Sequence, residues 1–191
     1  MPPKVKIDKN KIIEAALKII REEGLNNLNA RKIAKKLKCS TQPIFSNYKN
    51  MNELKDEISK ECVNIFNNYL KKGISDNNYP KYKATGMYYI KFAMEEKEIF
   101  KLLFMTDYKN PFQNDSIDYI YEIISESLKI SIEEAKSFHI NMWIFVHGIA
   151  TMEVTSNYKW SLEDISKMLT EMYLGLVTYY KNRNMNNKNN Y

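Results

Sequence analysis

The side chains best suited to recognition chemistry lie together in residues 39–50, which read "CSTQPIFSNYKN". Ser40, Thr41 and Gln42 carry hydroxyl and amide groups, which hydrogen-bond to the exposed edges of nucleic-acid bases. Pro43 suits the first turn of a helix, because the N–H that it lacks would have no intrahelical acceptor there. The order of these residues predicts a short recognition helix with a polar first turn.

Two aromatic residues follow in the same stretch and predict how this helix is held. Phe45 and Tyr48 are three residues apart, so they share a face, and at least one should anchor the helix to its neighbour. Asn47 and Lys49 would remain outside, within reach of phosphates. The alternative is an ordinary polar surface turn, which explains the polarity but not the basic residues on either side.

The distribution of charge indicates a polyanion partner at one end of the chain. Residues 1–50 contain 12 Lys and Arg against 4 Asp and Glu, a net charge of +8, whereas the remainder contains 17 basic and 19 acidic residues. A basic end beside a nearly neutral remainder is typical of nucleic-acid binding. A merely solvated basic surface is the alternative on charge alone.

Periodic apolar residues predict the helices that position the polar stretch. Asp8 can cap a first helix that Gly24 closes, and Asn29 can cap a second helix over residues 30–38. A tight turn then leads to a third helix at about residues 42–48. Three short helices with this turn predict a helix-turn-helix, whose third helix enters the major groove of DNA.

The rest of the chain also predicts helices and no strand, so the expected fold is all-α. A longer helix from Asn52 is expected to end at Gly73, and Ser131 and Ser161 are cap candidates for later helices. Those later helices are expected at about residues 81–97, 98–106, 115–130, 132–156 and 162–182. The predicted domains are a helix-turn-helix domain (1–51), a helical domain (52–182) and a disordered tail (183–191).

Other chemistry has little support in the sequence. Cys39 and Cys62 show neither metal-ligand spacing nor a disulfide framework, and His139 and His147 lie eight residues apart, too far for a zinc motif. No phosphate loop, nucleophile elbow or pair of catalytic carboxylates is present, so we expect no enzyme, no metal and no cofactor. The longest apolar run, "MWIFVHGIATM", is too short to span a bilayer, and we expect a cytoplasmic protein with no membrane partner.

From Ile12 to Leu54 the sequence "IIEAALKIIREEGLNNLNARKIAKKLKCSTQPIFSNYKNMNEL" resembles the DNA-binding domain of the tetracycline-repressor family. Gly24 after the first helix, the Ile-Ala pair of the second and Ser40 match that family's pattern. The resemblance implies a transcriptional regulator, with a repressor preferred, that binds a palindromic operator in double-stranded DNA. The DNA-binding residues that we predict are Asn29, Arg31, Ser40, Thr41, Gln42, Pro43, Phe45, Asn47, Tyr48 and Lys49.

Four positions depart from the family pattern, and one of them is Tyr48, which stands where Phe is usual. Phe45 replaces the usual Tyr and therefore lacks a phosphate-binding hydroxyl, whereas Asn47 replaces His and keeps its hydrogen-bonding capacity. Met51 replaces the usual Lys and removes one phosphate contact, although Lys49 is nearby. These changes preserve DNA binding as the expected function and alter its list of contacts.

The segment "MWIFVHGIA" resembles the Trp-His-Gly subclass of C-terminal domains in this family, through Trp143, His147 and Gly148. The resemblance implies that the last two long helices form a homodimeric four-helix bundle. The apolar stripe over residues 162–182 suits either a partner or a monomeric core. The predicted interface residues are Trp143, His147, Leu169, Tyr173, Leu176 and Tyr180.

Large adaptable side chains between residues 66 and 145 suit either an ordinary core or a cavity for a small apolar or aromatic effector. The family resemblance implies the cavity. The effector-binding residues that we predict are Phe66, Tyr69, Tyr89, Phe92, Phe104, Met105, Tyr108, Tyr121, Met142 and Phe145. In the alternative function, the chain is a helical ligand-binding or scaffold protein whose basic end binds RNA or an anionic membrane.

Overall fold

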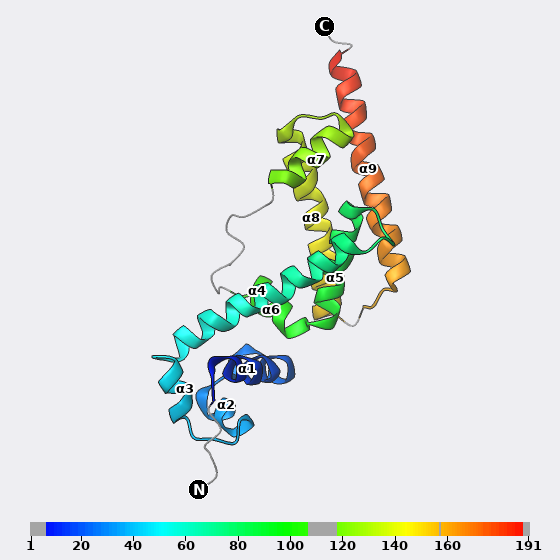
Figure 1. Ribbon diagram of the computed structural model, residues 1–191. Helices are drawn as coiled ribbons and strands as arrows, with labels where there is room; N and C mark the ends of the chain where they lie inside the picture. Colours follow the sequence, from blue (N-terminus) through cyan, green and yellow to red (C-terminus); the bar gives the residue numbers. More distant parts are fainter. Residues whose placement is uncertain (1–6, 107–117, 157, 189–191) are drawn as a thin grey trace. The chain divides into compact units, whose positions relative to one another are not determined.

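The computed structural model describes residues 7–106, 118–156 and 158–188 (Figure 1). These residues form nine α-helices and one 3-10 helix, and no strand occurs among them, so the predicted all-α fold is confirmed. The helices are α1 (Lys9–Glu23), η1 (Leu25–Asn27), α2 (Ala30–Lys36), α3 (Gln42–Asn47), α4 (Met51–Ser75), α5 (Lys81–Glu95), α6 (Lys97–Phe104), α7 (Asp118–Leu128), α8 (Ile132–Thr155) and α9 (Leu162–Lys188).

Polar residues begin and end the first helices as predicted. The Asp8 carboxylate accepts a hydrogen bond from the backbone N–H of Lys11 at 3.0 Å, and the Asn29 side chain accepts one from the backbone N–H of Lys32 at 3.0 Å. Gly24 follows α1 with a φ of +79°, a conformation that suits glycine because it has no Cβ. Both predicted N-caps are confirmed.

Helix α2 is shorter than the predicted 30–38, because a C-terminal capping motif ends it. Lys38 has a φ of +54°, and the Cys39 N–H donates to the Ala34 carbonyl at 3.0 Å. The Lys38 N–H donates to the Lys35 carbonyl at 3.2 Å, which completes a Schellman motif. A glycine usually occupies the residue with the left-handed backbone conformation at a helix end. Because a lysine occupies it here, the sequence did not predict where α2 ends.

Helix α4 continues past the glycine at which the sequence predicted its end. Gly73 lies within the helix, which runs to Ser75. A Cβ on Gly73 would come within 2.9 Å of the Tyr88 ring of α5. This glycine therefore permits close packing of two helices and does not terminate one.

Ser131 and Ser161 cap the last two helices, as predicted, and each does so in a capping box. The Ser131 hydroxyl accepts from the Glu134 N–H at 3.2 Å, and the Ser161 hydroxyl accepts from the Asp164 N–H at 3.0 Å. Helix α9 extends to Lys188, whereas the sequence predicted disorder from residue 183. Adding residues to an existing helix is far easier than starting one, which explains a helical end without an apolar period. Residues 189–191 lie outside the described residues.

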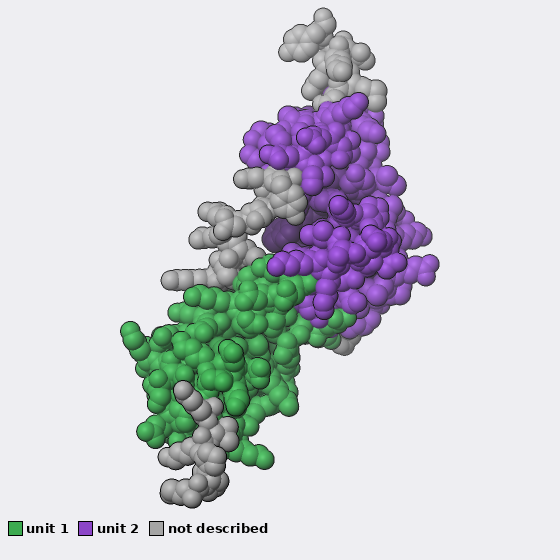
Figure 2. All heavy atoms as spheres, viewed as in Figure 1, with its two compact units in different colours: residues 1–68, 95–111 green, residues 69–94, 112–191 purple. Residues whose placement is uncertain are grey.

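The chain divides into two compact units (Figure 2). Unit 1 comprises residues 1–68 and 95–111, and unit 2 comprises residues 69–94 and 112–191. The predicted boundary at residue 51 differs, because unit 1 also takes in α6 and most of α4. Helix α6 buries the whole of its apolar face, formed by Ile99, Phe100, Leu102 and Leu103.

An ion pair joins the two sequence segments of unit 1. The Arg21 guanidinium on α1 donates two hydrogen bonds to the Glu96 carboxylate, each at 2.8 Å. Glu96 lies between α5 and α6, so the pair holds the start of α6 to α1. A fork of two parallel bonds also fixes the orientation of the two groups.

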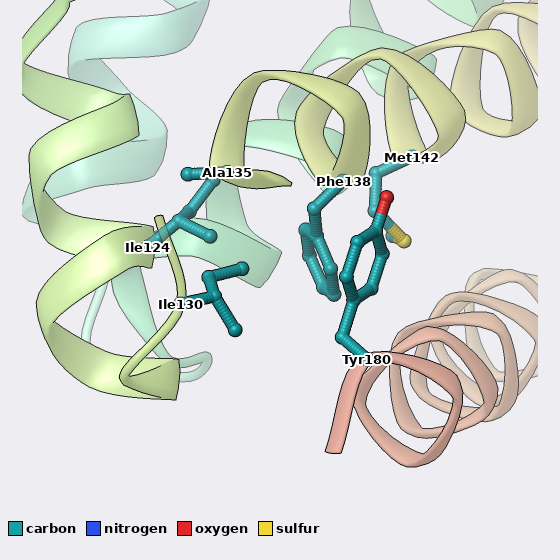
Figure 3. Close-up of a cluster of buried hydrophobic side chains, with 6 residues drawn as sticks. All are labelled: Ile124, Ile130, Ala135, Phe138, Met142 and Tyr180. Atoms are coloured by element: carbon teal, nitrogen blue, oxygen red, sulfur yellow. The ribbon is translucent and has the colours of Figure 1, made fainter. Parts of the chain in front are cut away.

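The core of unit 2 includes a cluster of buried side chains from α7, α8 and α9 (Figure 3). The Phe138 ring lies 5.9 Å from the Tyr180 ring, and Met142 lies beside them. Ile124, Ile130 and Ala135 form the other side of this cluster. The cluster therefore packs α8 against both α7 and α9.

A buried carboxylate fixes the connection between α8 and α9. Glu153 is only 1% exposed, and its carboxylate accepts a hydrogen bond from the Trp160 backbone N–H at 2.9 Å. The Lys159 ammonium lies 3.3 Å from the same carboxylate and also donates to the Glu153 carbonyl. The start of the connection to α9 is therefore attached to the last turns of α8.

Candidate functional site

Helix α3 has one buried and one exposed face. Ile44 and Tyr48 are buried, at 0% and 1% exposure, so one of the two aromatics anchors the helix as predicted. Tyr48 and Phe45 do not share a face, however, because α3 ends at Asn47 and Tyr48 has an extended backbone. Gln42 and Phe45 are exposed, Phe45 by 49%. Ser40 before the helix is exposed, whereas Thr41 and Pro43 are half-buried. The exposed face is therefore the part of α3 that a nucleic acid could contact.

Three of the predicted DNA-binding residues are engaged inside the protein. The Asn47 amide donates to the carbonyls of Pro43 at 2.8 Å and Ile7 at 3.3 Å, so it is a structural link and does not remain outside as predicted. Asn29 caps α2 with its side-chain oxygen. Tyr48 lies in the core, because its ring fills the space beneath the helix.

Internal ion pairs reduce the positive charge that α2 can offer. The Lys32 ammonium pairs with Glu23, and the Lys36 ammonium pairs with Glu22. The Lys36 ammonium holds the pKa of the Glu22 carboxyl below its usual range. Two of the lysines in "ARKIAKKLK" thus hold α2 to the end of α1.

Four other basic side chains of this region are exposed and form no ion pair with any described residue. Arg31 and Lys49 were predicted as contacts, whereas Lys35 and Lys38 were not. Lys38 lies in the turn that leads to α3. The basic run "ARKIAKKLK" was the available signal, but only the structure separates the paired lysines from the unpaired ones.

The Tyr48 hydroxyl is buried and has no hydrogen-bond partner among the described residues. Burial, reinforced by the carboxylates of Glu57 and Glu53, raises the pKa of Tyr48 to about 12. The Lys9 ammonium lies 4.9 Å from the ring centroid, in a cation–π contact that needs no hydroxyl. The ring stabilises the unit, and its hydroxyl does not.

Tyr48→Phe is expected to raise the free energy of unfolding by about 1 kcal/mol, because it removes an unsatisfied buried polar group and keeps the ring. Chemical denaturation checks this, with Tyr89→Phe as the control. The Tyr89 hydroxyl bonds to the His147 Nδ1 at 2.9 Å, so its removal should lower stability by a similar amount. A loss of stability in Tyr48→Phe would contradict the prediction.

The predicted effector-binding residues do not all belong to one unit. Phe66 and Phe104 are in unit 1, with ring centroids 5.5 Å apart, and Met105 there is exposed. Tyr108 lies outside the described residues. The remaining predicted residues belong to unit 2 and are Tyr69, Tyr89, Phe92, Tyr121, Met142 and Phe145.

Within unit 2, several of these residues are ordinary core. Phe92 is fully buried and packs edge-on against Tyr69, with ring centroids 5.3 Å apart. Met142 belongs to the cluster of Figure 3. Tyr121 and Phe145 are half-buried. Among the predicted effector-binding residues of unit 2, the half-buried aromatics are the ones that could contact a small molecule without a rearrangement of the core.

Two tyrosines of α5 bond to two histidines of α8. The Tyr82 hydroxyl lies 3.1 Å from the His139 Nδ1, and Tyr89 bonds His147. Burial lowers the pKa of both histidines and raises that of both tyrosines, so all four groups stay neutral at pH 7. Each imidazole thus has a different tyrosine partner. Trp143 stacks on His147, with ring centroids 5.1 Å apart.

Two of the six predicted interface residues are buried inside the single chain. Leu169 and Tyr180 are 2% and 4% exposed, because their side of α9 packs onto α8. Tyr173 and Leu176 are half-buried and pack against the cluster of buried side chains shown in Figure 3. Trp143 is exposed and His147 half-buried. The stripe on α9 that predicted the interface is thus mostly the monomer's own core.

A different apolar face remains open on α8 and α9. Large apolar side chains at helical spacing are exposed there. A Cβ built on Gly148 or Gly175 would have no described atom within 4 Å, apart from those of the adjacent residues and the backbone of its own helix. We call this set the α8/α9 face; it comprises Ile140, Trp143, Ile144, Gly148 and Met152 of α8 with Leu174, Gly175 and Tyr179 of α9. Sequence periodicity did not separate this face from the core stripe.

Among the described helices, none has the length and apolar character needed to cross a bilayer. No protein with a curated description matches the sequence. A TetR-like transcriptional regulator from Rhodococcus sp. RHA1 matches in structure, with a TM-score of 0.63 and 13% identity over 91% of this chain and 96% of that one. The multidrug binding protein EbrR, complexed with malachite green, matches with a TM-score of 0.61 and 12% identity over 90% and 98%.

A stretch that covers much of unit 2 and also α6 of unit 1 carries the family assignment. Residues 82–176 match the family model described as the tetracyclin repressor-like C-terminal domain. This region includes α5 to α8 and most of α9, while the helix-turn-helix order precedes it in the chain. The two solved structures share the same all-helical fold. The chain therefore belongs to the tetracycline-repressor family of transcriptional regulators.

Proposed function

We propose that this protein is a repressor that binds a palindromic operator as a homodimer and leaves it when a small apolar or aromatic effector binds. The observation that carries the proposal is the division of α3 into two faces. Ile44 and Tyr48 anchor the helix, while Gln42 and Phe45 stay exposed. Lys38 and Lys49, on either side of the helix in the sequence, pair with no acidic group in the described part of the chain. Such an arrangement supplies base contacts on the helix and phosphate contacts around it.

The α8/α9 face supports the homodimer. Its apolar side chains are exposed in the single chain, and a second copy would remove them from water. Gly148 and Gly175 leave room for the backbones of partner helices to approach. Two identical subunits related by a twofold axis would present two copies of α3, which matches a palindromic site.

Tyr121 and Phe145, two of the half-buried aromatics of unit 2, support an apolar or aromatic effector. The similar fold of a multidrug binding protein complexed with malachite green supports the same class. The effector must bind the DNA-free state more tightly, with a coupling of about 1–3 kcal/mol. Titration calorimetry should begin with malachite green and continue with neutral apolar compounds, and release of bound operator by a binder is the expected result.

Selection of duplexes from a random pool tests the DNA-binding proposal. At physiological salt, the selected duplex should bind at least about 10³-fold more tightly than random DNA. Lys49→Ala should weaken binding to every sequence alike and reduce the salt slope by about one. Equal affinity for the selected duplex, random DNA, RNA and anionic vesicles would instead indicate general polyanion binding and would refute the proposal.

A further inference from the structure

We infer that Phe45 reads the 5-methyl group of thymine in the operator, which makes it a specificity-determining residue; this inference rests on the proposed DNA-binding function. Phe45 is 49% exposed, although Ile44 beside it and Tyr48 one turn later are buried. It is the one large apolar side chain exposed on the described parts of α1, α2 and α3. Exposure of an aromatic ring is unfavourable in the free protein, and a contact in the complex would offset it.

The surroundings of Phe45 identify the partner chemistry. Gln42 precedes it by three residues and shares its exposed face, and the Gln42 amide bonds to no described residue. Lys38 and Lys49 flank the helix and form no ion pair with any residue that the structure describes. The phenyl ring and the amide would face the bases inside a major groove of DNA, while the lysines on either side would face the phosphates along its edges.

Within a major groove, the phenyl ring has one suitable partner. It has no hydroxyl, so it can neither donate to a phosphate nor bond to a base edge. Thymine presents a methyl group there, and apolar side chains contact it. The Gln42 amide can bond to adenine N6 and N7 in the same manner that asparagine and glutamine generally do. Together, the two side chains favour A·T pairs at the base-pair positions that they contact.

Replacement of thymine by uracil tests this inference, because it removes the methyl group and keeps every hydrogen-bonding group of the base. The probe is the duplex selected by the full-length chain, with uracil placed at one thymine at a time. Loss of one buried methyl group should weaken binding about fourfold, and loss in both half-sites about sixteenfold. Fluorescence anisotropy at fixed salt measures both values.

The variant Phe45→Ala should bind thymine and uracil duplexes equally at the position in question, because it no longer contacts the methyl group. Phe45→Leu is the matched control, since it keeps an apolar side chain and should keep most of the discrimination. Thermal unfolding of both variants verifies that they fold, as expected for a half-exposed position.

The outcomes separate this inference from the proposed function. If no duplex is enriched from the pool, both the DNA-binding proposal and this inference are refuted. If a duplex is enriched but the wild-type protein binds every uracil duplex as tightly as its thymine parent, the function stands and the reading of thymine by Phe45 is wrong. Discrimination that persists in Phe45→Ala also overturns it, because another residue then contacts the methyl group.

Discussion

Ile144→Glu is expected to convert the proposed homodimer into a monomer and to weaken operator binding by about 10²–10⁴-fold. Ile144 is 57% exposed on the α8/α9 face, so glutamate is harmless in the single chain. In the dimer, the same carboxylate would be buried without a partner, at a cost of several kcal/mol. A monomer engages only one half-site and loses the avidity that comes from two linked ones. Light scattering and operator titration measure the two effects.

Ile74→Glu is the matched control for this experiment. Ile74 is 41% exposed on α4, which contributes no residue to the α8/α9 face, so its replacement should change neither the mass of the particle nor its affinity for DNA. A parent protein that is monomeric at micromolar concentration would contradict the proposed dimer. So would an Ile144→Glu variant that remains a dimer with full affinity.

Lys159→Met is expected to lower the free energy of unfolding by about 2–4 kcal/mol, although Lys159 is half exposed. The reason is its partner: Glu153 is buried in the last turns of α8, and without the ammonium its charge is compensated only by the Trp160 N–H. A buried carboxylate without a counter-charge is strongly destabilising. The free energy of unfolding from denaturant titrations measures the loss.

Adding Glu153→Gln to Lys159→Met should restore most of that stability. A neutral amide needs no counter-charge, and its oxygen can still accept the Trp160 N–H. Lys136→Met is the matched control, because Lys136 pairs with Glu133 at 3.0 Å on the exposed surface of α8 and should cost less than about 0.5 kcal/mol. Equal losses in Lys136→Met and Lys159→Met would show that burial of the carboxylate does not matter.

Local features of the fold could be predicted from the sequence. The caps formed by Asp8, Asn29, Ser131 and Ser161 depend on residues within three positions of one another, so a single sequence contains the whole motif. The end of α2 could not be predicted, because its left-handed position is occupied by Lys38 where glycine is usual. Gly73 led to the wrong prediction that α4 ends there. Its role is to pack against Tyr88, which belongs to another helix and cannot be identified from local sequence.

The candidate site was also predictable only in part. The sequence indicated that Phe45 or Tyr48 would anchor α3, but only the fold shows that Tyr48 is buried and Phe45 is exposed. On α9, one amphipathic stripe suited both a core and a partner. The structure places Leu169 in the core and leaves Leu174 exposed. Periodicity identifies a face that is buried somewhere, and tertiary packing decides what buries it.

Unit 1 consists of two segments that are far apart in the chain, and this has a consequence for how it is synthesised. Helix α6 follows α3 by about 50 residues, or roughly 3–10 s of translation at typical rates. Until α6 emerges, Arg21 lacks its Glu96 partner and the α6 side chains that complete the unit are absent. The N-terminal part of unit 1 is therefore synthesised first but completed late. A nascent chain or a fragment that stops at residue 51 would have an incomplete core, although it contains all three helices of the proposed DNA-binding site.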